Sequence, residues 1–222
     1  MIAATTKTDL GKTRRDYYRA GATPNLINID KTRYLSITGV GDPDGHPFSQ
    51  RVEGLYAVAY AVKFINKQRG CDFVMPKLEG LWWFDEQRFG GVSMETAPRD
   101  VPRAHWRYRL LIQMPEFVEL GDLPLAIETV KTKKSLRQAE DVLWHELMEG
   151  ACVQVLHTGP FGEEGKSLGR LANFMTNNGL TRNGLHHEIY LSDFRRVPPE
   201  RLKTILREPI SQFNRLQNGA EK

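Results

Sequence analysis

One order of elements (strand, turn, helix, strand) occurs twice in the sequence, and this duplication restricts the fold more than any other feature. The first copy places these elements at residues 34–40, 41–45, 47–66 and 78–84. The second copy places them at residues 153–157, 158–162, 165–178 and 187–191. Duplicated units with short turns favour one sheet with two helices over one face, and the groove between such halves often holds a ligand. In this alignment Glu79 corresponds to Glu188, so a carboxylate lies near the start of the last strand of each copy.

Local signals predict the other elements. Apolar residues of the 47–66 helix recur on one stripe, and Tyr56 and Tyr60 lie on the same side because they are four residues apart. Beyond the duplicated elements, the expected strands are 92–94 and 106–114, and the expected helices are 122–131, 135–147 and one from 198 onward. The helix from Ser135 depends on capping-box spacing, and the last helix depends on prolines in its first turn.

These elements divide the chain into three parts. Residues 1–25 are polar and are predicted to form an arm that wraps the core. Residues 26–210 form the main domain, and residues 211–222 form a polar, frayed tail.

The stretch 185–193 reads as a strand on which an acidic residue needs an explanation. Residues two apart share a face of a strand, so Glu188 lies beside His186 and Tyr190, while Ile189 points the other way. Two interpretations of Glu188 remain open. It belongs either to an exposed polar face or to the floor of a ligand pocket.

Composition excludes several classes of protein. A hydrophobic content of 40% and a charged content of 26% are typical of a globular chain, with no apolar run long enough to span a bilayer and no signal peptide. The net charge of +4 is spread along the chain without a recognisable nucleic-acid motif, so we expect no direct nucleic-acid partner. Cys71 and Cys152 are interpreted as reduced thiols. We expect a cytoplasmic monomer or homodimer.

Patterns typical of metal and cofactor sites are absent from the sequence. His145 and Glu146 lack the second histidine of a zinc-protease helix, and His186 with Glu188 supplies only two ligands on one face. The glycine-containing turns do not have the spacing of a nucleotide-binding loop. We therefore predict that the protein uses neither a metal nor another cofactor.

Several motifs, in their order and spacing, resemble one known family. They are EGLWW at 79–83, Trp106 with the strand after it, LHTGPF at 156–161, EIYLSD at 188–193 and the segment 195–207. Together they resemble the GyrI-like small-molecule-binding domain, over about residues 25–210. The resemblance implies an α+β fold of duplicated βαββ (SHS2-type) units, with an antiparallel sheet, helices on one face and a central ligand cleft.

The resemblance also implies a function. Stand-alone GyrI-like proteins similar to this chain hydrolyse cyclopropane-containing, DNA-alkylating natural products of the yatakemycin and duocarmycin type, and so protect the cell. The implied pocket carboxylate is Glu188, and aromatic walls suit a flat ligand. As catalytic residues we predict Glu188 and Tyr56. Glu188 either activates water as a carboxylate or, when protonated, donates to the developing oxyanion, and Tyr56 polarises the electrophile, with Tyr190 as the alternative donor. The predicted ligand-binding residues are Trp83, Trp106, Tyr190, Glu79 and Tyr60.

Three hypotheses for the function follow. The first is the cofactor-independent hydrolase. The second is a binding module that sequesters or senses amphipathic or cationic aromatic drugs through the same residues, without chemistry. The third, a module that docks on a gyrase, would need an exposed acidic face, which a chain with a net charge of +4 does not favour.

Overall fold

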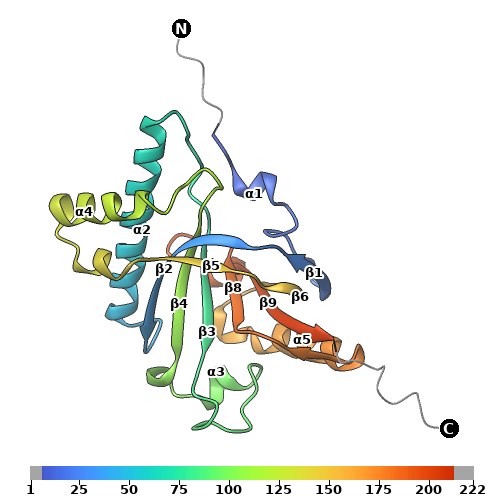
Figure 1. Cartoon of the computed structure of the whole chain (residues 1–222). Helices are drawn as coiled ribbons and strands as arrows, with labels where there is room; N and C mark the ends of the chain where they lie inside the picture. The colour runs from blue at the N-terminus through green and yellow to red at the C-terminus, as the bar shows by residue number, and fades with distance from the viewer. Residues whose placement is uncertain (1–6, 213–222) are drawn as a thin grey trace, which may run out of the picture.

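The computed structural model describes residues 7–212, which are organised around one nine-stranded sheet (Figure 1). Eight strands follow one another in the order β1-β6-β9-β8-β3-β4-β2-β5, and β7 pairs with β9 alone. Every pair in the sheet is antiparallel. The strands are β1 (Asn25–Ile29), β2 (Thr32–Val40), β3 (Leu78–Trp83), β4 (Arg107–Gln113), β5 (Leu143–Leu147), β6 (Gly150–Thr158), β7 (Leu180–Arg182), β8 (His186–Tyr190) and β9 (Lys203–Gln212).

Two long helices connect the strands of the two halves. They are α2 (His46–Gln68), which has a proline in its first turn, and α5 (Gly165–Asn177). A third helix, α4 (Asp122–Lys134), packs beside α2 (Figure 1). The short elements are α1 (Leu10–Thr13), α3 (Ala97–Asp100) and four 3₁₀ turns at Arg103–His105, Arg137–Asp141, Phe161–Glu163 and Pro199–Arg201.

The duplication is visible in the strand order. The first half is β2-α2-β3-β4 and the second is β6-α5-β8-β9, so both are βαββ units. In the sheet the halves lie as β6-β9-β8 and β3-β4-β2, which places an approximate twofold axis between β8 and β3. The predicted α+β fold of duplicated units is thus confirmed.

The strand register shows which residues share the face covered by the helices. One row across the six central strands consists of Val155, Leu206, Glu188, Gly80, Leu110 and Ile37. Residues directly opposite one another point to the same face. Leu206 packs against Leu171 of α5, and Leu110 belongs to the cluster that α2 covers. Both long helices therefore lie on this face, and Glu188 is the ionisable member of an otherwise apolar row.

The same register corrects the alignment of the two halves. Glu188 pairs with Gly80, whereas Glu79 pairs with Ile189 and points to the opposite face. The twofold axis relates Glu188 to Gly80 and not to Glu79, so the expected correspondence of the two glutamates is wrong by one residue. The cause is the two-residue period of a strand, in which a slip of one position exchanges the faces.

The opposite face of the sheet is covered by the segment that precedes β1. Tyr17 and Tyr18 from this segment are buried and pack near Ile189 and Ile205. Residues 7–24 of the predicted arm therefore pack on the face opposite the helices. Residues 1–6 of the arm and residues 213–222 of the predicted tail lie outside the described part of the chain.

Three element predictions are wrong. Residues 92 and 93 are irregular and residue 94 begins a turn, so the predicted strand is absent there. The helix predicted at 135–147 is a 3₁₀ turn followed by β5, because Ser135 adopts a left-handed conformation (φ 53°) that ends α4, and β5 then pairs with β2. The helix predicted from 198 is one 3₁₀ turn followed by β9, a strand buried on both faces between β6 and β8.

Candidate functional site

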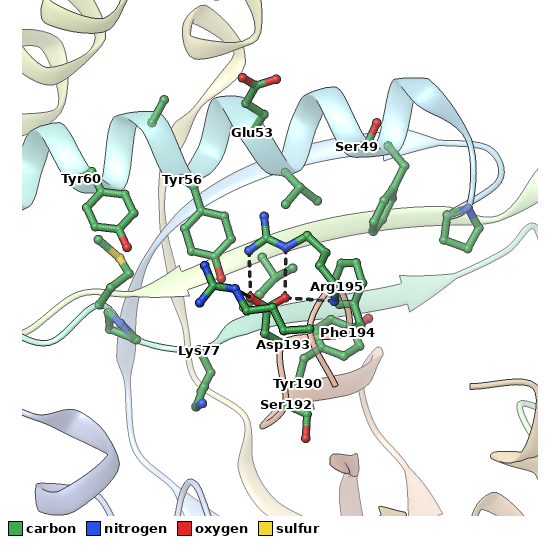
Figure 2. Close-up of a pocket in the computed structure, with 18 of the residues that line it drawn as sticks. Ser49, Glu53, Tyr56, Tyr60, Lys77, Tyr190, Ser192, Asp193, Phe194 and Arg195 are labelled. Carbon is green, nitrogen blue, oxygen red and sulfur yellow. Dashed lines mark hydrogen bonds and ion pairs between the residues drawn. The ribbon is translucent and has the colours of Figure 1, made fainter. Parts of the chain in front are cut away.

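A cavity of about 920 Å³ lies beneath α2, at the end of β8 where the chain leaves the sheet (Figure 2). Three segments enclose most of what we call the α2 cavity. They are one side of α2 from Phe48 to Tyr60, the residues 75–78 that lead into β3, and the loop 192–196 that follows β8. A volume of this size is sufficient for a drug-sized ligand.

Tyr190 forms the floor of the α2 cavity and connects it to Glu188. The Tyr190 hydroxyl donates to Glu188 Oε2 at 2.8 Å and accepts from Trp82 Nε1 at 2.8 Å. This meeting is possible because residue 80 is glycine. A Cβ atom there would lie 2.8 Å from Trp82 Nε1 and 3.0 Å from the Tyr190 hydroxyl. Gly80 therefore opens the space above β3 in which the hydroxyl reaches the carboxylate.

Glu188 is held among other ionisable groups. Its side chain is only 13% exposed, and His186 Nε2 lies 3.5 Å from Glu188 Oε1, a long contact. His186 Nδ1 is much closer to Glu208 Oε1, at 2.6 Å. Burial alone would lower the pKa of His186, but the carboxylates of Glu208 and Glu188 outweigh it and raise this pKa to about 10. The imidazolium therefore lies between two carboxylates and compensates their charge.

A third carboxyl group lies near this cluster. Glu164, at the start of α5, is buried, and its Oε1 atom has no hydrogen-bond partner in the described part of the chain. Burial and the charge of Glu188 hold the pKa of Glu164 well above its usual range. Burial and repulsion therefore both favour the protonated form of Glu164, because its charged form would be desolvated and would face the charge of Glu188.

Aromatic rings form much of the wall of the α2 cavity. Tyr56 and Tyr60, on α2, have ring centroids 6.4 Å apart. Phe194, which also lines the cavity, meets the ring of Tyr190 edge to face at 6.5 Å. Burial is the main cause that raises the pKa of Tyr56 to about 12, so its hydroxyl stays protonated and can serve as a donor at neutral pH.

The residues proposed from the sequence have different positions. Tyr56, Tyr60 and Tyr190 line the α2 cavity, and Glu188 lies directly beneath it. Trp106 is buried in the core, 6.0 Å from the ring of Trp82, and is not among the described residues that line the cavity. Trp83 packs on the opposite face of the sheet, near Tyr34 and Leu111.

Glu79 also lies on the opposite face, in what we call the buried network. It accepts hydrogen bonds from the hydroxyls of Tyr17 (2.5 Å) and Tyr18 (3.2 Å), and His187 Nε2 lies 3.0 Å away. His187 Nδ1 in turn contacts Glu149, which also pairs with the fully buried Arg207. These contacts attach the N-terminal segment to the sheet and give Glu79 a structural position.

Sequence reasoning missed the loop 192–196 as part of the site. Its Phe194 and Arg195 side chains reach the α2 cavity, and the Arg195 guanidinium lies 6.0 Å from the centre of the Tyr56 ring (Figure 2). The sequence signal for this loop, Ser192-Asp193 before two arginines, was assigned to the end of a strand. Trp82 was also absent from the predicted site residues. Its place two residues after Gly80, on the same face of the strand, was the sequence signal that could have indicated it.

Two further observations concern the described residues 7–212. None of their helices combines the length and the apolar character that a membrane crossing requires. Their histidine, cysteine and acidic side chains form no group of three or more that could hold a metal ion.

Comparison with known proteins gives consistent results. A family model of the GyrI-like small-molecule-binding domain matches residues 128–210. An uncharacterized conserved protein from Listeria innocua is 35% identical, with a TM-score of 0.82 over 92% of this chain and 100% of that one. Two further solved structures from the same organism, each of a hydrolase, are 34% and 33% identical, with TM-scores of 0.79 and 0.80, over 92% and 93% of this chain and all of theirs. A search of curated proteins finds no match. The chain belongs to the GyrI-like small-molecule-binding family.

Proposed function

We propose that this protein is a cofactor-independent hydrolase that adds water to the strained cyclopropane ring of flat aromatic, DNA-alkylating compounds. The observation that carries the proposal is the hydrogen-bonded chain from Trp82 through the Tyr190 hydroxyl to Glu188. The middle residue of this chain, Tyr190, forms the floor of an aromatic cavity. The relation to two hydrolases of Listeria innocua supports a hydrolytic reaction. Removal of the reactive ring would protect cellular DNA.

The proposed reaction divides the chemistry between two sides of the α2 cavity. The oxygen of a water molecule forms a bond to the cyclopropane methylene carbon, and the bond between that carbon and the spiro carbon breaks. The released electron pair moves through the ring to the carbonyl oxygen, which becomes a phenolate. The water gives its proton to the Tyr190 oxygen while the Tyr190 proton passes to Glu188, so the relay ends on a carboxylate. Tyr56 donates a hydrogen bond to the carbonyl oxygen as its charge grows. The phenolate then takes a proton from solvent, and Glu188 releases its proton to solvent, which regenerates the carboxylate.

The test is turnover of a spiro-cyclopropane compound by the purified protein, followed by mass spectrometry of the hydrated, ring-opened product. We expect product formation above the rate in buffer, and losses of about 10²–10⁴-fold in Glu188→Gln, as for removal of a general base. Tyr190→Phe keeps the ring but removes the relay, and we expect a loss of the same order. Full activity in both variants would refute the proposed relay.

The alternative is a binding module without chemistry. One observation favours this alternative. The carboxylate of Glu188 lies beneath the α2 cavity and already accepts a hydrogen bond from Tyr190, so a ligand can bind between the aromatic walls without contacting the carboxylate. Saturable quenching of tryptophan fluorescence with no ring-opened product would support this alternative and would contradict the hydrolase.

A further inference from the structure

The charged side chains around the α2 cavity leave an excess of positive charge. The acidic members are Asp44, Glu53 and Asp193, and the basic members are Lys77, Lys134, Arg195 and Arg196. Asp44 is engaged by Arg103, a residue outside the cavity. Glu53 projects from α2 away from Tyr56 and Arg195 (Figure 2). Lys77 also points away from Tyr56 and Arg195 (Figure 2), so the charged groups closest to Tyr56 belong to the loop 192–196.

Within the loop 192–196, one carboxylate serves two arginines. Arg195 makes a two-pronged contact to Asp193, with Nε at 3.0 Å from Oδ1 and Nη2 at 3.2 Å from Oδ2. Arg196 Nε lies 3.5 Å from Asp193 Oδ2. Asp193 also fixes the loop itself, because its Oδ1 accepts from the backbone N–H of Arg195 at 3.1 Å. One positive charge of the pair of arginines thus has no counter-charge on the loop.

Arg195 is the cation placed to act on a ligand. Its guanidinium lies over the Tyr56 ring, 6.0 Å from the ring centre, so a ligand that enters the α2 cavity beside Tyr56 meets this cation (Figure 2). A guanidinium stays charged throughout the accessible pH range and offers several N–H donors in one plane. It would repel a lipophilic cation and donate to the oxygen of a neutral or acidic ligand.

From this arrangement we infer that the α2 cavity selects neutral or anionic aromatic ligands that carry a hydrogen-bond acceptor, that it disfavours lipophilic cations, and that Arg195 determines this selectivity. The inference names the ligand class of the site proposed above and rests on that site. It also fits the proposed reaction, since Arg195 would stabilise the oxygen on which negative charge grows.

The test uses two ions of nearly equal size and shape, tetraphenylborate and tetraphenylphosphonium, each titrated against the unmodified protein by calorimetry. We expect the anion to bind about tenfold more tightly, as for one partly screened charge about 6 Å away. In Arg195→Gln this preference should largely disappear. Arg196→Gln is the matched control, because Arg196 is 84% exposed, and it should change the ratio much less.

A second variant should change the preference for the anion in the opposite direction. Asp193→Asn keeps the size of the side chain but removes the counter-charge, so the preference for the anion should increase several-fold. Equal or tighter binding of the phosphonium ion to the unmodified protein would overturn the inference, as would an unchanged ratio in Arg195→Gln or the failure of both ions to bind. Turnover is not measured in this experiment, so a protein that prefers the anion but does not hydrolyse cyclopropanes would disprove only the proposed reaction.

Discussion

Glu79 and Glu188 lie on adjacent strands but face opposite sides of the sheet, and we predict that neutralising them has opposite effects. Glu79→Gln should lower the stability of the fold and leave the chemistry of the α2 cavity intact. Glu188→Gln should lower stability much less and should impair the proposed chemistry of the α2 cavity. The two substitutions are identical in chemistry, so each is the control for the other.

The expected cost of Glu79→Gln follows from its contacts. Glu79 is fully buried and interacts with two tyrosine hydroxyls and His187. Burial alone would lower the pKa of His187, yet the carboxylates of Glu149 and Glu79 raise it, so the glutamine would remove one of two counter-charges from a buried imidazolium. Breaking a buried ion pair costs about 3–5 kcal/mol. We expect about 3 kcal/mol, because glutamine keeps one acceptor oxygen.

The measurement is urea unfolding followed by circular dichroism, with a thermal melt as a second readout. In a chain of this size 1 kcal/mol corresponds to about 2–4 °C in Tm, so Glu79→Gln should melt about 6–12 °C lower. Glu188→Gln keeps an acceptor for the Tyr190 hydroxyl but makes this hydrogen bond weaker, because the acceptor is no longer charged, and its free energy of unfolding should fall by about 1 kcal/mol. An unchanged urea midpoint in Glu79→Gln would refute the structural role of the buried network.

Three other predictions concern stability and the floor of the α2 cavity. The folded-state pKa of His186 is about 10, above the 6.5 of an unfolded histidine, so the stability that this histidine contributes is complete below pH 6.5 and is lost as the pH rises towards 10. The free energy of unfolding from urea titrations should fall by up to about 5 kcal/mol across that window. A flat profile would contradict a charged His186 in the folded protein. Gly80→Ala places a Cβ atom 3.0 Å from the Tyr190 hydroxyl, so we expect loss of turnover at least as large as in Tyr190→Phe, with normal circular dichroism as the control. Gly54→Ala gains helix propensity of about 1 kcal/mol, but its Cβ atom would lie 2.7 Å from Gln138 Cβ, so overpacking should win and the urea midpoint should decrease by the equivalent of about 1–2 kcal/mol.

The sequence predicted β2, β3, β4 and β6 because these runs are rich in β-branched and aromatic residues and are followed by turn signals or proline. It failed at β9, where burial on both faces removes the alternation. Leu202, Ile205 and Leu206 are spaced as on a helix, and the prolines before them resemble a helix start. The tertiary contacts with β6 and β8 decide the outcome, and no local pattern contains them.

The candidate site was predictable in part for a similar reason. Period-two alternation correctly placed Glu188 and Tyr190 on one face, because it depends only on strand geometry. The position of Trp83 depends on which of two adjacent tryptophans faces the helices, and a strand pattern alone does not decide this. Arg195 reaches the cavity through a loop whose shape depends on side-chain contacts of Asp193, which leave no periodic signal.

The difference between the halves at the twofold axis explains how a duplicated fold can carry a single carboxylate at that axis. Glu188 and Gly80 occupy related positions and are directly paired. Glutamate at both positions would place two carboxylates directly opposite each other, where like charges destabilise the pair and one would take up a proton. With glycine at one position, the Tyr190 hydroxyl and the Trp82 indole meet in the vacant space and orient the remaining carboxylate. The duplication thus supplies the location of the candidate site, and the loss of symmetry at this pair leaves one oriented carboxylate there, the group to which we assign the proposed chemistry.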